Sequence, residues 1–179
     1  MKTLFYIAFI LFCLIHLYLI VHFTRKKQKL NRNSGIAALV FFAALLPAML
    51  LFNINIPYFV LVLSLIAVFL HNFFGYYLKL YEKSKVFDRY LHAFGTFTFA
   101  LLVYFILGRF IEYGGSRTFL ALYVLLLGVA VATIFELFEF YMDIKKAANM
   151  QKGLRDTNTD MLFNLLGSIA AAVCVFFLI

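Results

Sequence analysis

Carboxylate and imidazole side chains gather near one end of three long apolar segments in the second half of the chain. The chain holds only eight acidic residues, and three of them, Glu82, Glu112 and Asp143, are interpreted as solvated charges of loops or helix ends. The other five acids and one histidine form three groups, each on one face of a helix because its members are three or four residues apart. The groups are Asp88 with His92, Glu136 with Glu139, and Asp156 with Asp160. Carboxylates with one imidazole are a ligand set for Mg²⁺, Mn²⁺, Zn²⁺ or non-haem iron, and they also carry protons. The predicted metal ligands or proton carriers are Asp88, His92, Glu136, Glu139, Asp156 and Asp160.

Two of these acids have a structural alternative, because Asp is common at the N-cap of a helix. Asp88 and Asp156 therefore remain open between a capping role and a ligand role. Glu136, Glu139 and Asp160 lie inside the expected helices and have no such alternative. They predict a functional or buried polar network. The candidates for a catalytic role are Asp88, His92, Glu136, Glu139 and Asp160.

Three further polar residues are candidates for binding a substrate. Asp156, Asp160 and Asn164 repeat every four residues, so they draw one polar stripe if their helix begins as early as Asp156. Arg89 and Arg155 flank the acids, and arginine can hold a phosphate through paired hydrogen bonds. The alternative for both arginines is a topological role as basic anchors at the cytoplasmic surface. The predicted substrate-binding residues are Arg89, Arg155 and Asn164, with Asn164 as hydrogen-bond support for the acids.

The elements that must position these side chains follow from the composition, which excludes a soluble domain, a disordered chain and a coiled coil. Hydrophobic residues make up 65% of the 179 residues and charged residues 13%, whereas soluble domains hold about half and about a quarter. A spanning helix needs about 20 mostly apolar residues. We predict an all-α polytopic bundle of six transmembrane helices, forming a single transmembrane domain over 1–179. The expected helices cover about 4–23, 35–52, 58–78, 90–107, 118–141 and 159–178.

The first segment and the cysteines bear on two other interpretations, a cleaved signal peptide and a chain held together by disulfides or by a zinc ion bound to cysteine. The segment 4–23 has a long apolar stretch and no small-residue cleavage site after it, so we interpret it as an anchoring helix and not as a signal peptide. Cys13 and Cys174 both lie inside apolar runs. They indicate neither a disulfide framework nor a zinc site.

The lysines and arginines predict the orientation of the helices. Five, four and four of the 16 basic residues fall in the loops that follow 4–23, 58–78 and 118–141, and Lys85 and Lys146 are among them. Cytoplasmic loops carry the excess of Lys and Arg, so these three loops are predicted to be cytoplasmic and both termini to lie outside. The net charge of +8 is thus explained by topology. We predict the bilayer as a partner and no nucleic acid.

Topology also brings the polar ends of three segments to one leaflet. Sequential helices alternate in direction, so the start of 90–107, the end of 118–141 and the start of 159–178 meet on the cytoplasmic side. Glu136 lies nine residues before the first lysine of the next loop, roughly 13 Å along a helix. A charge at the bilayer centre costs about 2.5–3.5 kcal/mol, so Glu136 and Glu139 are expected to face the bundle interior. Two carboxylates three residues apart on one helix face lie close together, so they are expected to share a proton or to bind a cation.

Three classes of function fit such a site. In a metal-dependent lipid-phosphate enzyme, a divalent cation would neutralise the phosphate of a lipid headgroup or lipid-linked precursor while an Asp or His acts as general base. Intramembrane acids and histidines also mark proton or cation pathways. A transporter of this size would be expected to form an oligomer. The third class sequesters a ligand at the cell envelope without chemistry.

The order of the motifs resembles that of the VanZ-like family of small bacterial membrane proteins. VanZ-like sequences often have Gln where this chain has Glu139 and Lys where it has Arg89, and the extra carboxylate favours a cation site. The variant Asp156-Thr157-x-x-Asp160-Met161 is closer to the YjdF-type relatives. The resemblance implies a bacterial plasma-membrane location and an envelope-related role, which for VanZ is low-level resistance to the glycopeptide teicoplanin. The motifs that carry it are Asp88-Arg89-x-x-His92, Glu136-x-x-Glu139 and Arg155-x-x-x-x-Asp160-x-x-x-Asn164-x-x-Gly167.

Overall fold

All regular secondary structure among the described residues is helical, which confirms the predicted all-α class. The computed structural model describes residues 2–84, 86–145 and 150–178. Within these ranges six helices are long and apolar enough to cross a membrane. Lys85 and Lys146, which were assigned to the cytoplasmic loops, lie outside the described residues.

The chain divides into two compact units, each with its own core. The first unit comprises Met1–Phe87 and the second comprises Asp88–Ile179. All of the predicted site residues belong to the second unit. The single transmembrane domain predicted for 1–179 stays a prediction.

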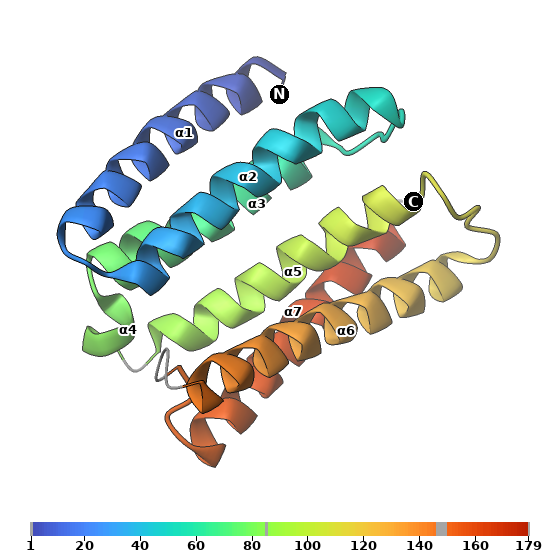
Figure 1. The fold of residues 1–179 in the computed structure, drawn as a ribbon. Coiled ribbons are helices and arrows are strands. Elements are labelled where there is room, and N and C mark those ends of the chain that lie inside the picture. Colours follow the sequence, from blue (N-terminus) through green and yellow to red (C-terminus); the bar gives the residue numbers. More distant parts are fainter. Residues whose placement is uncertain (1, 85, 146–149, 179) are drawn as a thin grey trace. The chain divides into compact units, whose positions relative to one another are not determined.

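Three membrane-length helices form the first unit (Figure 1). α1 (Lys2–Arg25) packs on α2 (Lys29–Leu51) and on α3 (Tyr58–Phe69). α3 continues without a break as a π-helical segment, η1 (Leu70–Tyr77), and the short α4 (Leu80–Lys83) follows. These elements confirm the three helices expected in the first half of the chain.

α2 begins six residues before the predicted residue 35. Residues 29–34 are mostly polar, so the apolar pattern alone did not include them. The turn before α2 is short because Lys27 adopts a left-handed backbone conformation (φ 58°), which ends α1 and reverses the chain. Pro47 lies inside α2 and does not end it.

The second unit consists of three long helices that alternate in direction (Figure 1). They are α5 (Phe87–Leu107), α6 (Arg117–Ile144) and α7 (Leu154–Leu178). α6 and α7 pack against each other as antiparallel neighbours. The start of α5, the end of α6 and the start of α7 therefore lie at the same end of this unit, as predicted.

Two glycines let the helices of the second unit approach closely. A Cβ on Gly128 of α6 would lie 2.6 Å from Ser168 Oγ of α7. A Cβ on Gly167 of α7 would overlap the backbone carbonyl oxygen of Ala93 in α5. Small residues at such positions allow close helix packing inside a membrane, where van der Waals contact is a main source of association. The two contacts fix α7 against both of its neighbours.

α5 and α7 begin earlier than predicted, at Phe87 instead of 90 and at Leu154 instead of 159. Asp88 and Asp156 therefore lie within the first helical turns. The N-cap alternative is wrong for both, because an N-cap residue precedes the first turn. The first turns of α5 and α7 are polar, which is why the apolar pattern placed the helix starts too late.

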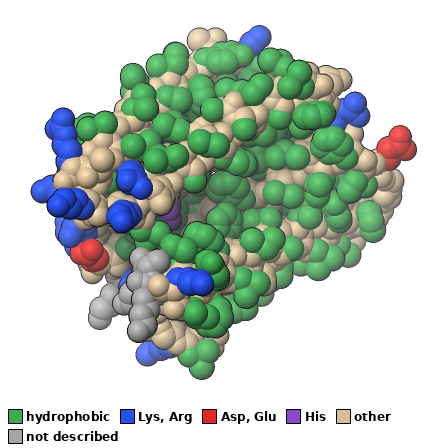
Figure 2. All heavy atoms as spheres, in the orientation of Figure 1, with side chains coloured by type: hydrophobic (Ala, Val, Ile, Leu, Met, Phe, Trp, Pro, Cys, Tyr) green, Lys and Arg blue, Asp and Glu red, His purple; other side chains and the backbone are tan. Residues whose placement is uncertain are grey.

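Apolar side chains cover the exposed flanks of the helices. On the face seen in Figure 2, hydrophobic side chains dominate the middle of the helices and Lys and Arg side chains lie toward their ends. On α6, Leu126 and Ile134 are 63% and 66% exposed. Large apolar side chains left open over a whole helix flank are what a lipid-facing surface requires.

Labelling of single cysteines tests the predicted orientation. With Cys13 and Cys174 replaced by alanine, a cysteine at Lys27 is expected to react with a membrane-impermeant reagent only after the cells are opened. A cysteine at Gly114, in the turn before α6, is expected to react from outside in intact cells, and a Cβ there meets open space. The opposite pattern of labelling would reverse the orientation derived from the basic loops.

Candidate functional site

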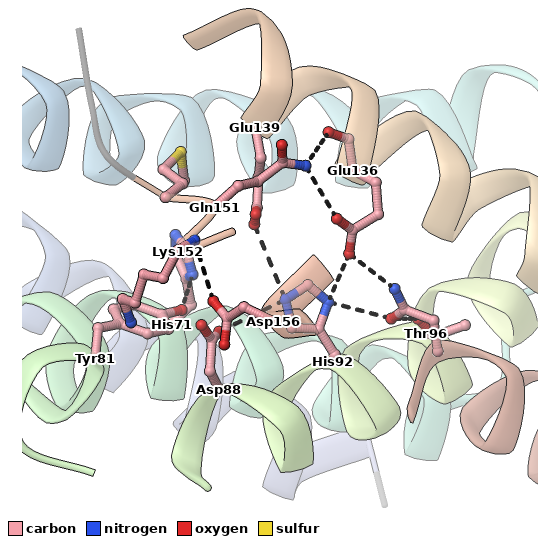
Figure 3. Close-up of polar contacts among 12 residues, drawn as sticks. His71, Tyr81, Asp88, His92, Thr96, Glu136, Glu139, Gln151, Lys152 and Asp156 are labelled. Atoms are coloured by element: carbon pink, nitrogen blue, oxygen red, sulfur yellow. Dashed lines mark hydrogen bonds and ion pairs between the residues drawn. The ribbon is translucent and has the colours of Figure 1, made fainter. Parts of the chain in front are cut away.

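His92 lies at the centre of a polar cluster formed by α5, α6 and α7 (Figure 3). Asp88 precedes it by one turn of α5, and Asp88 Oδ1 is 3.5 Å from His92 Nε2. Glu139 of α6 approaches the same nitrogen, with Oε1 3.9 Å away. The Nε2 side of the imidazole ring therefore faces two half-buried carboxylates.

Asp160 of α7 completes a group of potential metal ligands. One ligand atom each from Asp88, His92 and Asp160 lies within 4.8 Å of the other two. Asp160 is only 5% exposed, and its Oδ1 has no hydrogen-bond partner among the described residues. Leaving a buried polar atom unpaired costs about 1–3 kcal/mol. This oxygen is thus available to a ligand, and binding one would remove the cost of leaving the atom unpaired.

The opposite nitrogen of His92 faces an amide and a further carboxylate. Nδ1 lies 3.2 Å from Asn164 Oδ1 and 3.6 Å from Glu136 Oε1. Asn164 Nδ2 donates to Glu136 Oε1 at 3.3 Å, and the Thr96 hydroxyl donates to Asn164 Oδ1 at 2.7 Å. Glu136 and Asn164 are 7% and 4% exposed. Both are buried among polar partners, as expected for charged or amide groups inside a bundle.

Helical periodicity positions these side chains. α5 and α7 each carry polar residues at every fourth position, so each helix presents one polar stripe. The close approach of Gly167 to Ala93 lets the two stripes meet, and α6 adds Glu136 and Glu139 from the same end of the unit. The two stripes are Asp88, His92 and Thr96 on α5, and Asp156, Asp160 and Asn164 on α7.

The chain between α6 and α7 contributes a partner for Glu136. Gln151 Nε2 donates to the Glu136 backbone oxygen at 3.2 Å and to its Oε2 at 3.4 Å. The carboxylate of Asp143 in turn accepts the backbone N–H groups of Met150 and Gln151, each at 2.8 Å. The interpretation of Asp143 as a solvated loop charge is therefore wrong, because it holds the segment that carries Gln151.

Two polar partners in the cluster, Thr96 and Gln151, were not predicted from the sequence. Thr96 lies four residues after His92, so the helical spacing that linked Asp88 to His92 would also have identified it. Gln151 lies in a connecting segment, where no periodicity marks the direction of a side chain.

The other predicted residues lie at the edge of the cluster. Asp156 belongs to the same polar stripe but lies outside the ligand group, and its Oδ2 accepts the backbone N–H of Lys152 at 3.3 Å. Arg89 is half-buried, and its Nε has no hydrogen-bond partner among the described residues. Arg155 is exposed at the start of α7. Arg89 thus has a donor that an anionic group could use, and Arg155 is accessible to one.

The charges of the cluster favour a bound cation or shared protons. Four carboxylates lie around the single imidazole of His92, and all of them belong to helices of membrane-spanning length. Carboxylates this close in a medium of low dielectric cannot all be ionised unless a positive charge joins them. The four are Asp88, Glu136, Glu139 and Asp160.

Comparison with known families places the chain among membrane proteins. A family described as "Predicted membrane protein (DUF2238)" matches residues 3–179. The chain belongs to this family. Membership in DUF2238 agrees with the six membrane-length helices. The family description names neither VanZ nor YjdF, so the predicted resemblance is supported at the level of a membrane protein family.

One relative of this DUF2238 chain is an uncharacterized protein of Thermotoga maritima. The two are 37% identical over 111 residues, which is 62% of this chain and 58% of the relative. The chain thus matches less than two thirds of the length of that relative. No solved structure matches the chain.

Proposed function

We propose that this membrane protein binds a divalent cation at Asp88, His92 and Asp160 and uses it to hold a phosphate-bearing lipid headgroup or lipid-linked precursor. The observation that carries the proposal is the convergence of three ligand atoms within 4.8 Å, one of them from Asp160, whose buried Oδ1 has no hydrogen-bond partner among the described residues. Two ligands on opposite sides of an ion lie about 4–5 Å apart. Small side-chain movements therefore suffice to close the group around a metal.

The donor types favour a first-row transition ion over calcium. Ca²⁺ takes six to eight oxygen ligands in its usual protein sites, whereas this group offers two carboxylates and one imidazole nitrogen. Imidazole suits Zn²⁺ and Fe²⁺, and carboxylates suit Mn²⁺ and Mg²⁺. A mixed nitrogen and oxygen set fits Mn²⁺, Fe²⁺ or Zn²⁺ best. The ligand group leaves coordination positions for an external oxygen.

A lipid phosphate is the external ligand that best suits the surroundings. The ligand group lies near the ends of helices that are long enough to cross a membrane, where headgroups are found. Arg89, next to Asp88 in the first turn of α5, has at Nε a donor without a partner among the described residues, and Arg155 is exposed at the start of α7. Arginine and a metal ion together neutralise a phosphate. The resemblance to VanZ-like proteins supports an envelope role in a bacterial plasma membrane.

Proton-coupled or cation-coupled transport is a second candidate. The specific observation in its favour is the continuous set of polar contacts from Gln151, in the segment before α7, through Glu136 and His92 to Asp88. The last three residues belong to helices of spanning length. Linked carboxylates and imidazoles of this kind form proton relays in pumps and transporters.

Metal and lipid binding by the purified protein test the proposal. After chelator treatment, the protein is titrated with Mn²⁺, Zn²⁺ and Mg²⁺, and bound metal is measured by mass spectrometry. The expected result is one ion per chain, together with metal-dependent capture of phosphatidic acid vesicles and not of phosphatidylcholine vesicles. The Glu82→Gln variant, which changes an exposed acid outside the site, is expected to behave like the wild type. Absence of metal binding, with proton flux into liposomes, would favour the transport candidate instead.

A further inference from the structure

The two ring nitrogens of His92 lie in chemically different surroundings. Nδ1 faces Asn164 Oδ1 at 3.2 Å and Glu136 Oε1 at 3.6 Å. Nε2 faces Asp88 Oδ1 and Glu139 Oε1 at 3.5 and 3.9 Å. A neutral imidazole carries its proton on one nitrogen and a lone pair on the other. The chemistry of the site therefore depends on which nitrogen holds the proton.

Glu136 determines the orientation of the Asn164 amide. A positive charge in the site, from a cation or from a doubly protonated His92, allows Glu136 to be ionised. An ionised carboxylate only accepts hydrogen bonds, so the end of the amide that contacts Glu136 Oε1, at 3.3 Å, is the NH₂ group. The amide oxygen must then point the other way, toward Thr96 and His92, and it accepts the Thr96 hydroxyl at 2.7 Å. The Thr96 hydroxyl can donate or accept a hydrogen bond, so it is compatible with either orientation of the Asn164 amide. Glu136 therefore determines that orientation.

The oriented amide in turn selects the tautomer of His92. Asn164 Oδ1 is an acceptor, so it requires a proton on Nδ1. The negative charge of Glu136 Oε1, 3.6 Å from the same nitrogen, favours the same proton position. The lone pair of the neutral ring is then on Nε2, on the side of Asp88 and Glu139. Those carboxylate oxygens are acceptors too, so a lone pair directed at them is favourable only with a cation between the groups.

We infer that Glu136 and Asn164 are positioning residues that keep the proton of His92 on Nδ1 and present Nε2 as the metal-binding atom. The role of Nε2 as a ligand rests on the proposed cation site, whereas the proton on Nδ1 does not, because without a cation Nε2 can take a second proton that faces Asp88 and Glu139. Histidines that bind a metal commonly donate their other N–H group to a carboxylate or a carbonyl oxygen, which fixes the ring and raises its basicity as a ligand. Glu136, predicted from the sequence as a ligand, thus acts on the metal through the amide and the ring.

Nitrogen-15 NMR of the histidine rings reads the proton position directly. In Zn²⁺-loaded wild type, with the His92→Gln variant identifying the signals of His92 among the four histidines, Nδ1 is expected to be protonated and Nε2 to be metal-bound. Zinc bound through Nδ1 would overturn the inference. If no zinc binds, the proposed function fails, and the ring of the metal-free protein decides the inference: a proton on Nδ1, alone or together with one on Nε2, upholds it, and a proton on Nε2 alone overturns it.

Two variants separate positioning from general structural support. In Glu136→Gln the new amide can turn either end toward Asn164, so a share of the metal-free rings is expected to carry a proton on Nε2 alone. The zinc affinity is expected to fall by about 10- to 100-fold. Thr96→Val is the matched control, because it removes a hydrogen bond to the same Asn164 oxygen and leaves the Glu136 contact intact. Its tautomer is expected to stay that of the wild type. Equal effects of the two substitutions, or no effect of Glu136→Gln, would overturn the inference, and the wild-type spectrum decides it if a variant fails to fold.

Discussion

Replacing Asp160 by asparagine is expected to abolish tight cation binding while leaving the metal-free protein at least as stable as the wild type. The substitution keeps the shape of the side chain and removes one charge from the ligand group Asp88, His92 and Asp160. Losing a residue that supports a ligand costs about 10- to 100-fold in metal affinity, so losing a ligand itself is expected to cost more than about 100-fold. The metal-free protein gains because Asp160 Oδ1 is buried without a partner among the described residues. Asparagine still places a polar atom there, but burying a neutral amide costs less than burying a charge, so the unfolding free energy is expected to rise by about 1 kcal/mol.

Loss of cation binding without loss of stability in Asp160→Asn distinguishes a binding site from a structural network. Thermal unfolding in detergent, with and without Mn²⁺, measures both quantities in one series, since a ligand of the folded state raises its stability. Asp156→Asn is the matched control, one turn earlier on the same helix and outside the ligand group, and it is expected to keep metal-dependent stabilisation. If Asp160→Asn lowers the stability of the metal-free protein and Mn²⁺ stabilises neither protein, the carboxylate is structural and the cation site is wrong.

Gly167→Ala is expected to be the most destabilising single methyl addition in the second unit. The new Cβ would overlap the carbonyl oxygen of Ala93, and a backbone atom inside a helix cannot move aside as the end of a flexible side chain can. Overpacking of a close contact costs about 1–3 kcal/mol, occasionally more, and we expect the upper part of this range. Because α5 and α7 must separate, Asp160 moves away from Asp88 and His92. Cation binding is therefore expected to be lost together with stability.

A second glycine in the same unit provides the control. A Cβ on Gly95 of α5 meets no atom within 4 Å, so Gly95→Ala is expected to be neutral or to stabilise the helix by up to about 1 kcal/mol. Unfolding of both variants in mixed detergent and titration with Mn²⁺ measure the difference. Wild-type stability and metal affinity in Gly167→Ala would show that the helices do not depend on this close approach.

Local properties of the sequence determined the helices and the faces on which the polar residues lie. Each spanning segment is a run of apolar residues long enough to cross a bilayer, and this requirement acts on each segment by itself. The four-residue repeat put Asp88 with His92, and Asp160 with Asn164, because helical geometry alone sets that relation. Alternation of direction then brought the polar ends of α5, α6 and α7 to one end of their unit. Where the helix starts are polar, as in α2, α5 and α7, the apolar pattern placed them several residues late.

Only the tertiary structure decided which polar atoms meet. The rotation of α6 and α7 about their own axes follows from the packing of Gly128 on Ser168 and of Gly167 on Ala93. That rotation directs Glu136 to the Nδ1 side of His92 and Glu139 to the Nε2 side, although the two glutamates are only three residues apart. Asp143 and Gln151 join through a connecting segment whose path no periodicity predicts. Spacing along one helix fixes a face, but which face meets which neighbour depends on contacts between residues far apart in the chain.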